Sequence, residues 1–408
     1  MPVDRLTTVL RNHVTGLREA GTAKGSETVV VGVRRAEGAR GPRFLLEGEG
    51  DKEFMRMNSN SYLGMGLRQE VIEAEERATA EFGTGPGAVR FISGTYEAHL
   101  TLENELATFH GREAGIIFSS AYAAIVSTIT PLVTPDTVLI SDELNHNCII
   151  NAMRLSRPMG KAIYKHNDMT GLAAALEEWK GKAKRALVVT DGIFSMRGDH
   201  APLDEVMELC SRHDDGFEEN AVCIVDDSHG VGAFGRTGRG TEEHTECAPV
   251  DVLVGTLGKA FGVNGGYVVA NRATIDFLRE SSQMYIYSNP ITVGEAAAAL
   301  ASLRVVGSAE GEDLLAKLRS LTQRFEDGLG RIGIETLPGP HPVVPLMIRD
   351  TSETHRLAKH LYDNGILVTG LAYPVVPSGD EEIRAQVNAD HTEADIDRVL
   401  ALLEAGVS

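Results

Sequence analysis

The stretch Val252-Leu253-Val254-Gly255-Thr256-Leu257-Gly258-Lys259 joins a short apolar run to a glycine-rich segment that ends in a lysine. An apolar run of this kind predicts a buried strand, and the glycines allow the backbone after it to come close to a ligand. Thr256 offers a hydroxyl to a phosphate, and Lys259 supplies an amine three residues later. A surface charge is the alternative for Lys259, and the stretch alone does not decide between the two.

Comparable apolar runs upstream predict the rest of a parallel sheet. The runs at 138–140, 186–189 and 222–225 lack the alternation of polar and apolar residues, as expected for strands that are buried on both faces. The spacing between 186, 222 and 252 fits strand-helix-strand units. Residues 115–133 carry no charge and approach the length of a membrane span, but they are better explained as a short buried strand followed by a core helix.

The length of 408 residues exceeds what one hydrophobic core usually serves, so we expect three parts. Residues 1–60 would form an amphipathic helix over 4–20, lying on something else, and small-sheet strands at 28–33 and 43–46. Residues 61–290 would form a large α/β domain, and residues 291–408 a smaller α+β domain. The smaller domain is predicted to contain helices at 293–306, 353–364 and from 393, with Thr392 as N-cap, and strands at 343–348, 366–369 and 383–387.

The formal net charge of −19 argues against non-specific binding to nucleic acids or membrane surfaces, because both are polyanionic. An anionic substrate must therefore meet local positive charge. The four cysteines lack CxxC spacing and the density of a disulfide scaffold, which predicts free structural thiols in a reducing, cytoplasmic location. The N-terminus lacks the apolar core of a signal peptide, and the histidines form no zinc-binding motif, so we expect no metal.

Polar residues follow two of the predicted strands directly. Asp226 and His229 come after the run at 222–225, and His146 follows the run at 138–140. A carboxylate at the end of a buried strand needs a positive partner, and a protonated ring nitrogen of a ligand would be one. A planar imidazole at position 146 could stack on the same ring. A helix cap, a structural ion pair or a core histidine is the alternative for each residue taken alone.

Two other patterns suggest different chemistry. Residues 230–235 fit GxGxxG, but Arg236-Thr237-Gly238-Arg239-Gly240 does not favour the helix that a dinucleotide site requires. Thr256 and Lys259 have the spacing of acyl-serine enzymes, but no Lys-Thr-Gly follows them. The acidic run 214–220 is predicted to be a solvated turn between a helix and a strand.

Taken in order, the motifs resemble those of the α-oxoamine synthases, a family of fold-type I pyridoxal-phosphate enzymes, over nearly the whole chain. They are Asn60-Ser61-Tyr62-Leu63-Gly64, Val89-Arg90-Phe91-Ile92-Ser93-Gly94-Thr95, Ser119-Ser120-Ala121-Tyr122, Ser141-Asp142 with Asn145-His146, Thr190-Asp191-Gly192-Ile193-Phe194-Ser195-Met196, Val225-Asp226-Asp227-Ser228-His229-Gly230 and Gly255-Thr256-Leu257-Gly258-Lys259. The resemblance implies a mostly parallel seven-stranded sheet in the large domain and a smaller α+β domain. It also implies a homodimer with active sites at the subunit interface.

The resemblance assigns the contacts of pyridoxal phosphate residue by residue. Lys259 would hold the cofactor as a Schiff base and move the α-proton of the substrate. Asp226 would bond the pyridine nitrogen, His146 would stack on the ring and His229 would hydrogen-bond the phenolic oxygen. The phosphate would be held by the amides of Ala121 and Tyr122, by Thr256, and by Ser288 of the partner subunit.

The family pattern places Asn60, Ser195 and Arg384 at the substrate, with Ser195 also beside the cofactor. The guanidinium of Arg384 would grip an amino-acid carboxylate and so supply the positive charge that the acidic chain requires. The implied reaction is a Claisen-type condensation of an amino acid with an acyl-CoA thioester, releasing CoA. An aldolase, aminotransferase or racemase using the same cofactor, and a catalytically silent relative, are the alternatives.

Within the family, the residues are most similar to the glycine C-acetyltransferase branch, which implies glycine and acetyl-CoA as substrates, or the reverse cleavage in threonine catabolism. The grounds are the motif at 89–95, the Asp-Asp-Ser-His run at 226–229, and residues 369–377. Three departures leave the substrates open: Ala121-Tyr122 replaces the usual Cys-Phe, residues 262–266 are one residue short, and 214–220 is an insertion. A longer acyl-CoA or another amino acid, as in the 8-amino-7-oxononanoate, serine palmitoyl and 5-aminolevulinate types, is the alternative.

Overall fold

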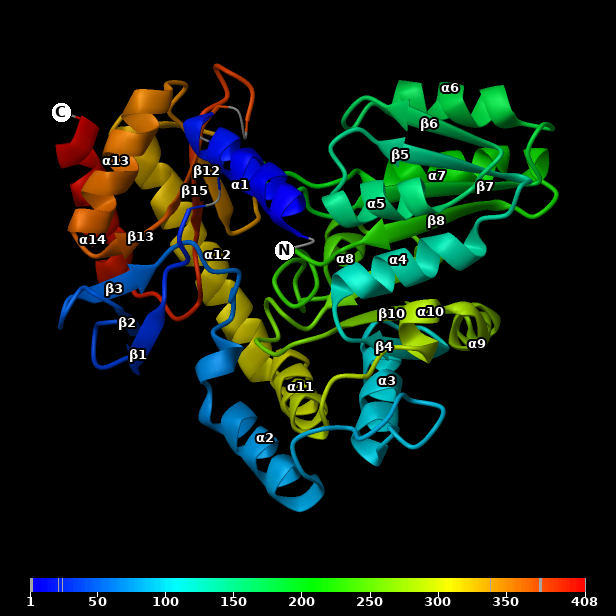
Figure 1. The fold of residues 1–408 in the computed structure, drawn as a ribbon, viewed down its shortest axis with the longest axis horizontal. Coiled ribbons are helices and arrows are strands. Elements are labelled where there is room, and N and C mark those ends of the chain that lie inside the picture. Colours follow the sequence, from blue (N-terminus) through cyan, green and yellow to red (C-terminus); the bar gives the residue numbers. More distant parts are fainter. Residues whose placement is uncertain (1–2, 21, 24, 338, 374–375, 408) are drawn as a thin grey trace.

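Seven strands form the central sheet of the protein (Figure 1), seen here in a computed structural model that describes residues 3–20, 22–23, 25–337, 339–373 and 376–407. The strand order is β4 (Ala114–Phe118), β10 (Gly266–Ala270), β9 (Val252–Thr256), β8 (Ala221–Asp226), β7 (Arg185–Asp191), β5 (Thr137–Asp142) and β6 (Gly160–Tyr164). β10 is antiparallel to both of its neighbours, and the pairs from β9 to β6 are parallel. The mostly parallel seven-stranded sheet is therefore confirmed.

Helices cover both faces of this sheet, which explains why its strands carry no polar face. Successive residues of β7 point to opposite cores: Val188 belongs to one cluster, and Leu187 and Val189 to the other. The first cluster includes side chains of α3 (Glu97–Phe109), α6 (Met169–Trp179), α7 (Leu203–His213) and α11 (Val293–Val306). The second includes α4 (Ala121–Leu132), α5 (Asn147–Leu155) and α9 (Arg272–Ser281).

The uncharged stretch at 115–133 forms the buried strand β4 and the core helix α4, as predicted. In the part of the chain that the structure describes, no helix is long and apolar enough to cross a membrane. The acidic run at 214–220 begins with the short 3-10 helix η2 (Asp214–Gly216) and connects α7 to β8.

The two ends of the chain build a second sheet together. Its order is β1 (Val30–Arg34), β2 (Arg43–Leu46), β3 (Glu53–Arg56) and β13 (Ile366–Leu367), and β13 pairs parallel to β3. The third sheet contains β11 (Glu335–Thr336), β12 (Val343–Met347), β15 (Glu382–Gln386) and β14 (Thr369–Leu371). The single strand expected at 366–369 was therefore wrong: its first two residues pair with β3, and the chain then crosses to pair with β15.

The remaining helices largely follow their sequence patterns. α11, α13 (Thr351–Asp363) and α14 (Glu393–Val407) lie where they were predicted, and Asp395 N donates to Thr392 Oγ1 at 3.1 Å at the start of α14. The long helix α12 (Ala309–Arg331) runs between the large sheet and the C-terminal elements in Figure 1. The other helices are η1 (Met65–Leu67), α2 (Gln69–Phe82), α8 (Thr241–Thr245) and α10 (Gln283–Ile286).

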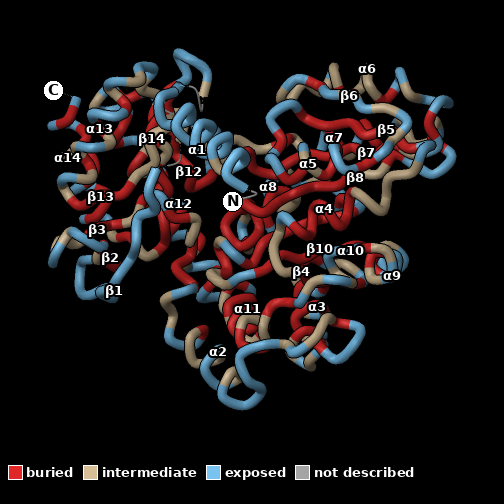
Figure 2. Tube along the Cα trace, viewed as in Figure 1, coloured by how far each residue is buried: buried red, intermediate tan, exposed pale blue. Residues whose placement is uncertain are grey.

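The N-terminal helix α1 (Asp4–Glu19) forms as predicted, but none of its residues is buried in the single chain (Figure 2). Leu6 and Leu10, which belong to its apolar face, are 58% and 55% exposed. The expectation that this face lies on something else is therefore not tested by a single chain, in which the described residues leave the face uncovered. An apolar helix face left in water needs a cover from outside the chain.

Candidate functional site

The candidate residues meet at one edge of the central sheet. Because β5, β7, β8 and β9 are parallel, their carboxyl ends lie at the same edge, where open α/β sheets bind ligands. A pocket of about 220 Å³ opens there. Its lining residues are Ala121, Tyr122, His146, Cys148, Asp191, Ile193, Ser195, Asp226, Ser228, His229, Thr256 and Lys259. Eight of the residues named from the sequence are thus brought together from five separate segments of the chain.

Lys259 lies in the turn after β9 and points its amine into this pocket. Burial lowers the pKa of Lys259 to about 8, while the carboxylates of Asp226 and Asp191 oppose the shift. The turn is fixed by its backbone, since Leu257 N donates to Gly265 O at 3.0 Å and Gly258 N donates to Thr256 Oγ1 at 3.1 Å. About a tenth of the amine is therefore neutral, and nucleophilic, at pH 7, and about half at pH 8.

Asp226 and His146 are held beside each other through Cys148. Asp226 is buried at the end of β8, where Oδ1 accepts a hydrogen bond from Ser228 N at 3.1 Å and Oδ2 lies 3.4 Å from Cys148 Sγ. His146 Nδ1 accepts from Cys148 N at 3.2 Å, so the histidine caps α5 while its ring lines the pocket. Its backbone N donates to Asp191 Oδ2 at 2.9 Å. Burial lowers the pKa of His146 against the opposing pull of Asp226, which favours a neutral ring.

His229 is buried on another side of the pocket. Its Nδ1 lies 2.7 Å from the hydroxyl of Tyr62, and its carbonyl oxygen accepts from His341 Nε2 at 2.9 Å. Burial, reinforced by the positive charge of Lys259, holds the pKa of His229 well below its usual range. The neutral ring can therefore donate or accept one hydrogen bond at the pocket, according to the position of its single proton.

The N-terminus of α4 faces the same pocket with unpaired backbone donors. Ser120 Oγ accepts from Ala123 N at 3.1 Å, and the amides of Ala121 and Tyr122 belong to the first turn, which has no intrahelical acceptor. Helix N-termini of this kind bind phosphate groups. Gly266 supports the approach of α4 to the sheet, because a Cβ atom there would lie 2.3 Å from Ala121 N.

The three substrate candidates form a connected group next to the pocket. Arg384, on β15, donates from Nε to the carbonyl oxygen of Ser195 at 2.6 Å, and its Nη2 lies 3.5 Å from Asn60 Oδ1. Gln386 Nε2 also donates to Asn60 Oδ1, at 3.3 Å. Burial lowers the pKa of Arg384 against the opposing effect of Tyr62 and Glu382, and the hydrogen bonds that its guanidinium makes go to a carbonyl and an amide oxygen among the described residues. A carboxylate from outside the chain would complete its pairing.

Ser288 is not part of the pocket in a single chain. It follows α10, and its Oγ donates to the carbonyl oxygen of Asn289 at 3.5 Å. Part of the family motif at 369–377, namely Pro374 and Val375, lies outside the described residues.

The pocket fits pyridoxal phosphate by the chemistry of its lining. Ser228 Oγ is buried without a hydrogen-bond partner among the described residues, which indicates a polar ligand. The helix N-terminus suits an anionic phosphate, Asp226 suits a protonated ring nitrogen, and Lys259 suits an aldehyde.

Three further residues contribute to the site without having been assigned a role from the sequence. Asp191 ends β7 in register with Asp226 on β8, and burial together with the carboxylate of Asp226 raises the pKa of Asp191 well above its usual range. Its position at the end of a buried strand carried the same signal that identified Asp226. Tyr62 lies within a quoted motif, but its contact with His229 depends on the fold. Cys148 was predicted only to be a free structural thiol; it is free, and it also lines the site.

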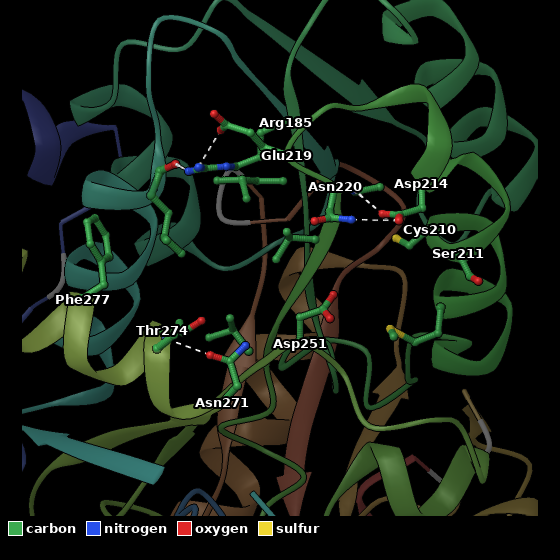
Figure 3. Close-up of a pocket in the computed structure, with 17 residues that line it drawn as sticks. Arg185, Cys210, Ser211, Asp214, Glu219, Asn220, Asp251, Asn271, Thr274 and Phe277 are labelled. Atoms are coloured by element: carbon green, nitrogen blue, oxygen red, sulfur yellow. Dashed lines mark hydrogen bonds and ion pairs between the residues drawn. The ribbon is translucent and has the colours of Figure 1, made fainter. Parts of the chain in front are cut away.

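A larger surface pocket, of about 610 Å³, lies at the opposite ends of β7, β8 and β9 (Figure 3). Several of its polar side chains are paired within the chain. Arg185 bonds Glu219 at 2.7 Å, Asp214 accepts from Asn220 and from Ala221 N, and Asn271 caps α9 through Thr274 N. It contains none of the residues that the sequence analysis assigned to the cofactor or the substrate.

Comparison with known proteins extends the resemblance of the motifs. The family profile for aminotransferase class I and II matches residues 52–403. An 8-amino-7-oxononanoate synthase of Thermosipho melanesiensis is 35% identical over 373 residues, covering 91% of this chain and 92% of that protein. The mitochondrial 2-amino-3-ketobutyrate coenzyme A ligase of Homo sapiens is 38% identical over 408 residues, covering 98% and 92%. A solved structure of serine palmitoyltransferase with a pyridoxal-phosphate internal aldimine superposes with a TM-score of 0.86 at 26% identity, covering 99% and 97% of the two chains.

Proposed function

Since the chain belongs to the aminotransferase class I and II family, as one of its α-oxoamine synthases, we propose that it condenses glycine with acetyl-CoA, releasing CoA. Its cofactor is pyridoxal phosphate. One observation carries the proposal: the buried amine of Lys259 and the buried carboxylate of Asp226 line one small cleft, and the guanidinium of Arg384 lies beside it, bonded to the carbonyl oxygen of the pocket residue Ser195.

When bound, the cofactor withdraws electrons from the α-carbon of an amino acid. The side chains of the protein then have separable tasks. Arg384 and Asn60 would hold the substrate carboxylate, and Lys259 would remove the α-proton, for which a pKa of about 8 suits a general base near neutral pH. Asp226 would keep a ring nitrogen protonated by its negative charge.

The choice of glycine and acetyl-CoA is supported by the similarity to 2-amino-3-ketobutyrate coenzyme A ligase over nearly the whole chain. The second candidate is another α-oxoamine synthase reaction, with a longer acyl-CoA or another amino acid. It is favoured by the 8-amino-7-oxononanoate synthases, which match over similar lengths at 34–38% identity. Ala121 and Tyr122, which depart from the glycine C-acetyltransferase motif, line the same pocket.

The test is a matrix of acyl-CoA lengths from acetyl to palmitoyl against glycine, alanine and serine, with release of free CoA as the readout. The proposal expects the highest kcat/KM for glycine with acetyl-CoA, and no release by Lys259→Ala. A maximum at a longer chain or another amino acid would establish the second candidate. If no pair of substrates releases CoA, and the protein instead transaminates an amino acid or cleaves it in an aldol reaction, both candidate functions are refuted.

We also infer that the protein works as a homodimer in which Ser288 serves the pocket of the partner subunit. Two observations support this arrangement: Ser288 is outside the pocket of its own chain, and the apolar face of α1 is uncovered. Mixed dimers of Lys259→Ala with Ser288→Glu chains test it. If Ser288 acts across the interface, each mixed dimer contains one intact site and regains activity; if it acts within its own chain, the mixture stays inactive.

A further inference from the structure

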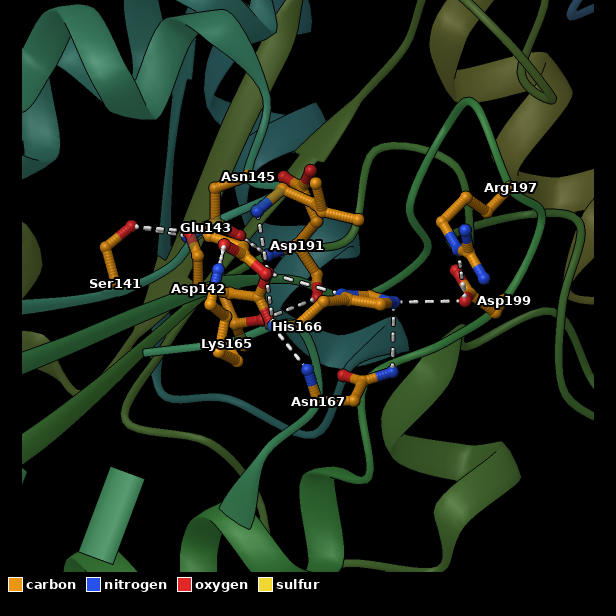
Figure 4. Close-up of polar contacts among 12 residues, drawn as sticks. Ser141, Asp142, Glu143, Asn145, Lys165, His166, Asn167, Asp191, Arg197 and Asp199 are labelled. Atoms are coloured by element: carbon orange, nitrogen blue, oxygen red, sulfur yellow. Dashed lines mark hydrogen bonds and ion pairs between the residues drawn. The ribbon is translucent and has the colours of Figure 1, made fainter. Parts of the chain in front are cut away.

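His166, directly after β6, bridges two carboxylates that belong to different segments (Figure 4). Its Nδ1 lies 3.3 Å from Asp142 Oδ1 at the end of β5, and its Nε2 lies 3.0 Å from Asp199 Oδ2 in the segment after β7. The ring also meets the edge of Phe194, with centroids 4.4 Å apart. His166 thus connects the edge of the sheet to the segment 194–199.

Both carboxylates are anchored to the backbone or to a neighbouring cation. Asp142 accepts from Leu144 N at 2.8 Å and from Asn167 N at 2.9 Å. Asp199 Oδ2 also accepts from Arg197 Nε at 3.0 Å, and Phe194 N donates to Asp199 O at 2.9 Å. The segment 194–199 is therefore closed on itself, and the imidazole of His166 ties it to the end of β5.

That segment presents Ser195 to the substrate group. The carbonyl oxygen of Ser195 accepts the 2.6 Å hydrogen bond from Arg384 Nε, which leaves the terminal nitrogens of the guanidinium to face Asn60 and the site. A displacement of the segment would turn the guanidinium, because this bond fixes the plane of the fork. The orientation of Arg384 thus depends on its hydrogen bond to Ser195, the residue that follows Phe194.

We propose that His166 is a positioning residue: by bridging Asp142 and Asp199 it fixes the segment 194–199, so that Ser195 holds Arg384 in the orientation that binds the substrate carboxylate. The inference rests on the proposed function, because it takes Arg384 as the carboxylate ligand. His166 itself does not line the pocket, so its effect on the substrate is indirect.

The charge state of His166 makes the bridge strong at neutral pH. Burial by itself would lower the pKa of His166, but Asp142 and Asp199 outweigh it and raise the pKa to about 9. Other charged or titratable groups surround this cluster. Arg197 donates to Asp199, and Glu143 pairs with Lys165 and accepts from the backbone N of His166. Burial lowers the pKa of His200, and the charge of Asp199 opposes that shift. Both contacts are therefore charge-assisted below pH 9, and they weaken as the pH rises through that value.

The experiment compares glycine with methylamine, which lacks the carboxylate, in the cofactor-loaded protein, with affinities measured by absorbance titration. We expect His166→Gln to weaken glycine binding on the order of tenfold and methylamine binding by less than about twofold, with kcat at saturating glycine nearly unchanged. Lys165→Gln is the matched control, since Lys165 is an exposed neighbour paired with Glu143, and it should change neither affinity. The wild-type preference for glycine should fall above pH 9, and that of His166→Gln should not.

A second readout needs neither cofactor nor substrate. Amide hydrogen exchange of the unloaded protein should be faster over 194–199 in His166→Gln than in wild type, and unchanged in Lys165→Gln. Asp199→Asn, which removes the other half of the bridge, should reproduce both effects and serves if His166→Gln does not fold. In the double variant, adding His166→Gln to Arg384→Lys should cause little further loss of glycine affinity, because both substitutions act through the contact between Arg384 and Ser195.

The outcomes separate this inference from the proposed function. If wild-type protein binds glycine no better than methylamine, the role of Arg384 is wrong and the inference fails with it. If wild type discriminates but His166→Gln keeps its glycine affinity, or loses both ligands equally, the inference alone is overturned.

Discussion

The pKa of Lys259 leads to a quantitative prediction for cofactor capture. With a pKa of about 8, the neutral fraction of the amine is about 9% at pH 7, 50% at pH 8 and 91% at pH 9. The rate at which protein freed of cofactor captures pyridoxal phosphate should therefore rise about tenfold from pH 7 to pH 9 and then level off. An ordinary lysine with a pKa of 10.5 would instead give a rise of about a hundredfold over the same range, continuing above pH 9.

The assay is stopped-flow absorbance between pH 7 and pH 10, where the cofactor phosphate is already ionised because its second pKa is near 6. Borohydride fixation and peptide mapping identify the lysine, and Lys259→Ala is the blank. Asp226→Asn removes a carboxylate that raises the pKa of Lys259, so the pH at which the capture rate levels off should be lower in this variant. A profile that keeps rising through pH 10 would refute the reasoning that burial dominates at this lysine.

Three other substitutions have defined expectations. Glu103→Gln leaves Arg90 and Arg279 without their shared buried anion, which should lower the free energy of unfolding by about 3–5 kcal/mol. For 408 residues this corresponds to a melting temperature about 4–6 °C lower in a thermal scan. A shift under about 1 °C would contradict this expectation. Gly266→Ala should weaken pyridoxal phosphate binding in equilibrium titration, because the methyl group would displace the start of α4. Arg384→Lys should raise the KM for glycine about a hundredfold with a smaller effect on kcat, since a single ammonium cannot form the bidentate pair.

The part of the fold that could be predicted from the sequence is the part in which each strand is buried on both faces. The runs that became β5, β7, β8 and β9 are apolar throughout, and a polar residue marks the end of each. β6 was missed because it is an edge strand, and its Lys161 and Ile163 are exposed. β10 is also apolar and fully buried but was not named from the sequence; its place between β4 and β9, antiparallel to both, depends on long-range pairing that no local pattern specifies.

The candidate site divides in a similar way. Asp226, Lys259 and His146 could be proposed from their positions after strands, whereas Asn60 and Arg384 came only from the family resemblance, because they meet across 324 residues of chain. The role of His166 was not visible in the sequence at all. Its two carboxylate partners are brought to it by the register of β5 against β6 and by the return of the chain after β7.

The pairing of β3 with β13 has a consequence for chimeric enzymes. Met55 and Arg56 pair with Ile366 and Leu367, so the first and last parts of the chain share one set of backbone hydrogen bonds. A chimera that takes its first 60 residues from one relative and its last 120 from another must form the pairing of β3 with β13 between segments of different origin. This pairing lies only a few residues from Asn60 on one side and from Thr369 on the other. Crossover points that exchange both ends together and keep residues 61–290 from a single parent preserve the pairing of β3 with β13.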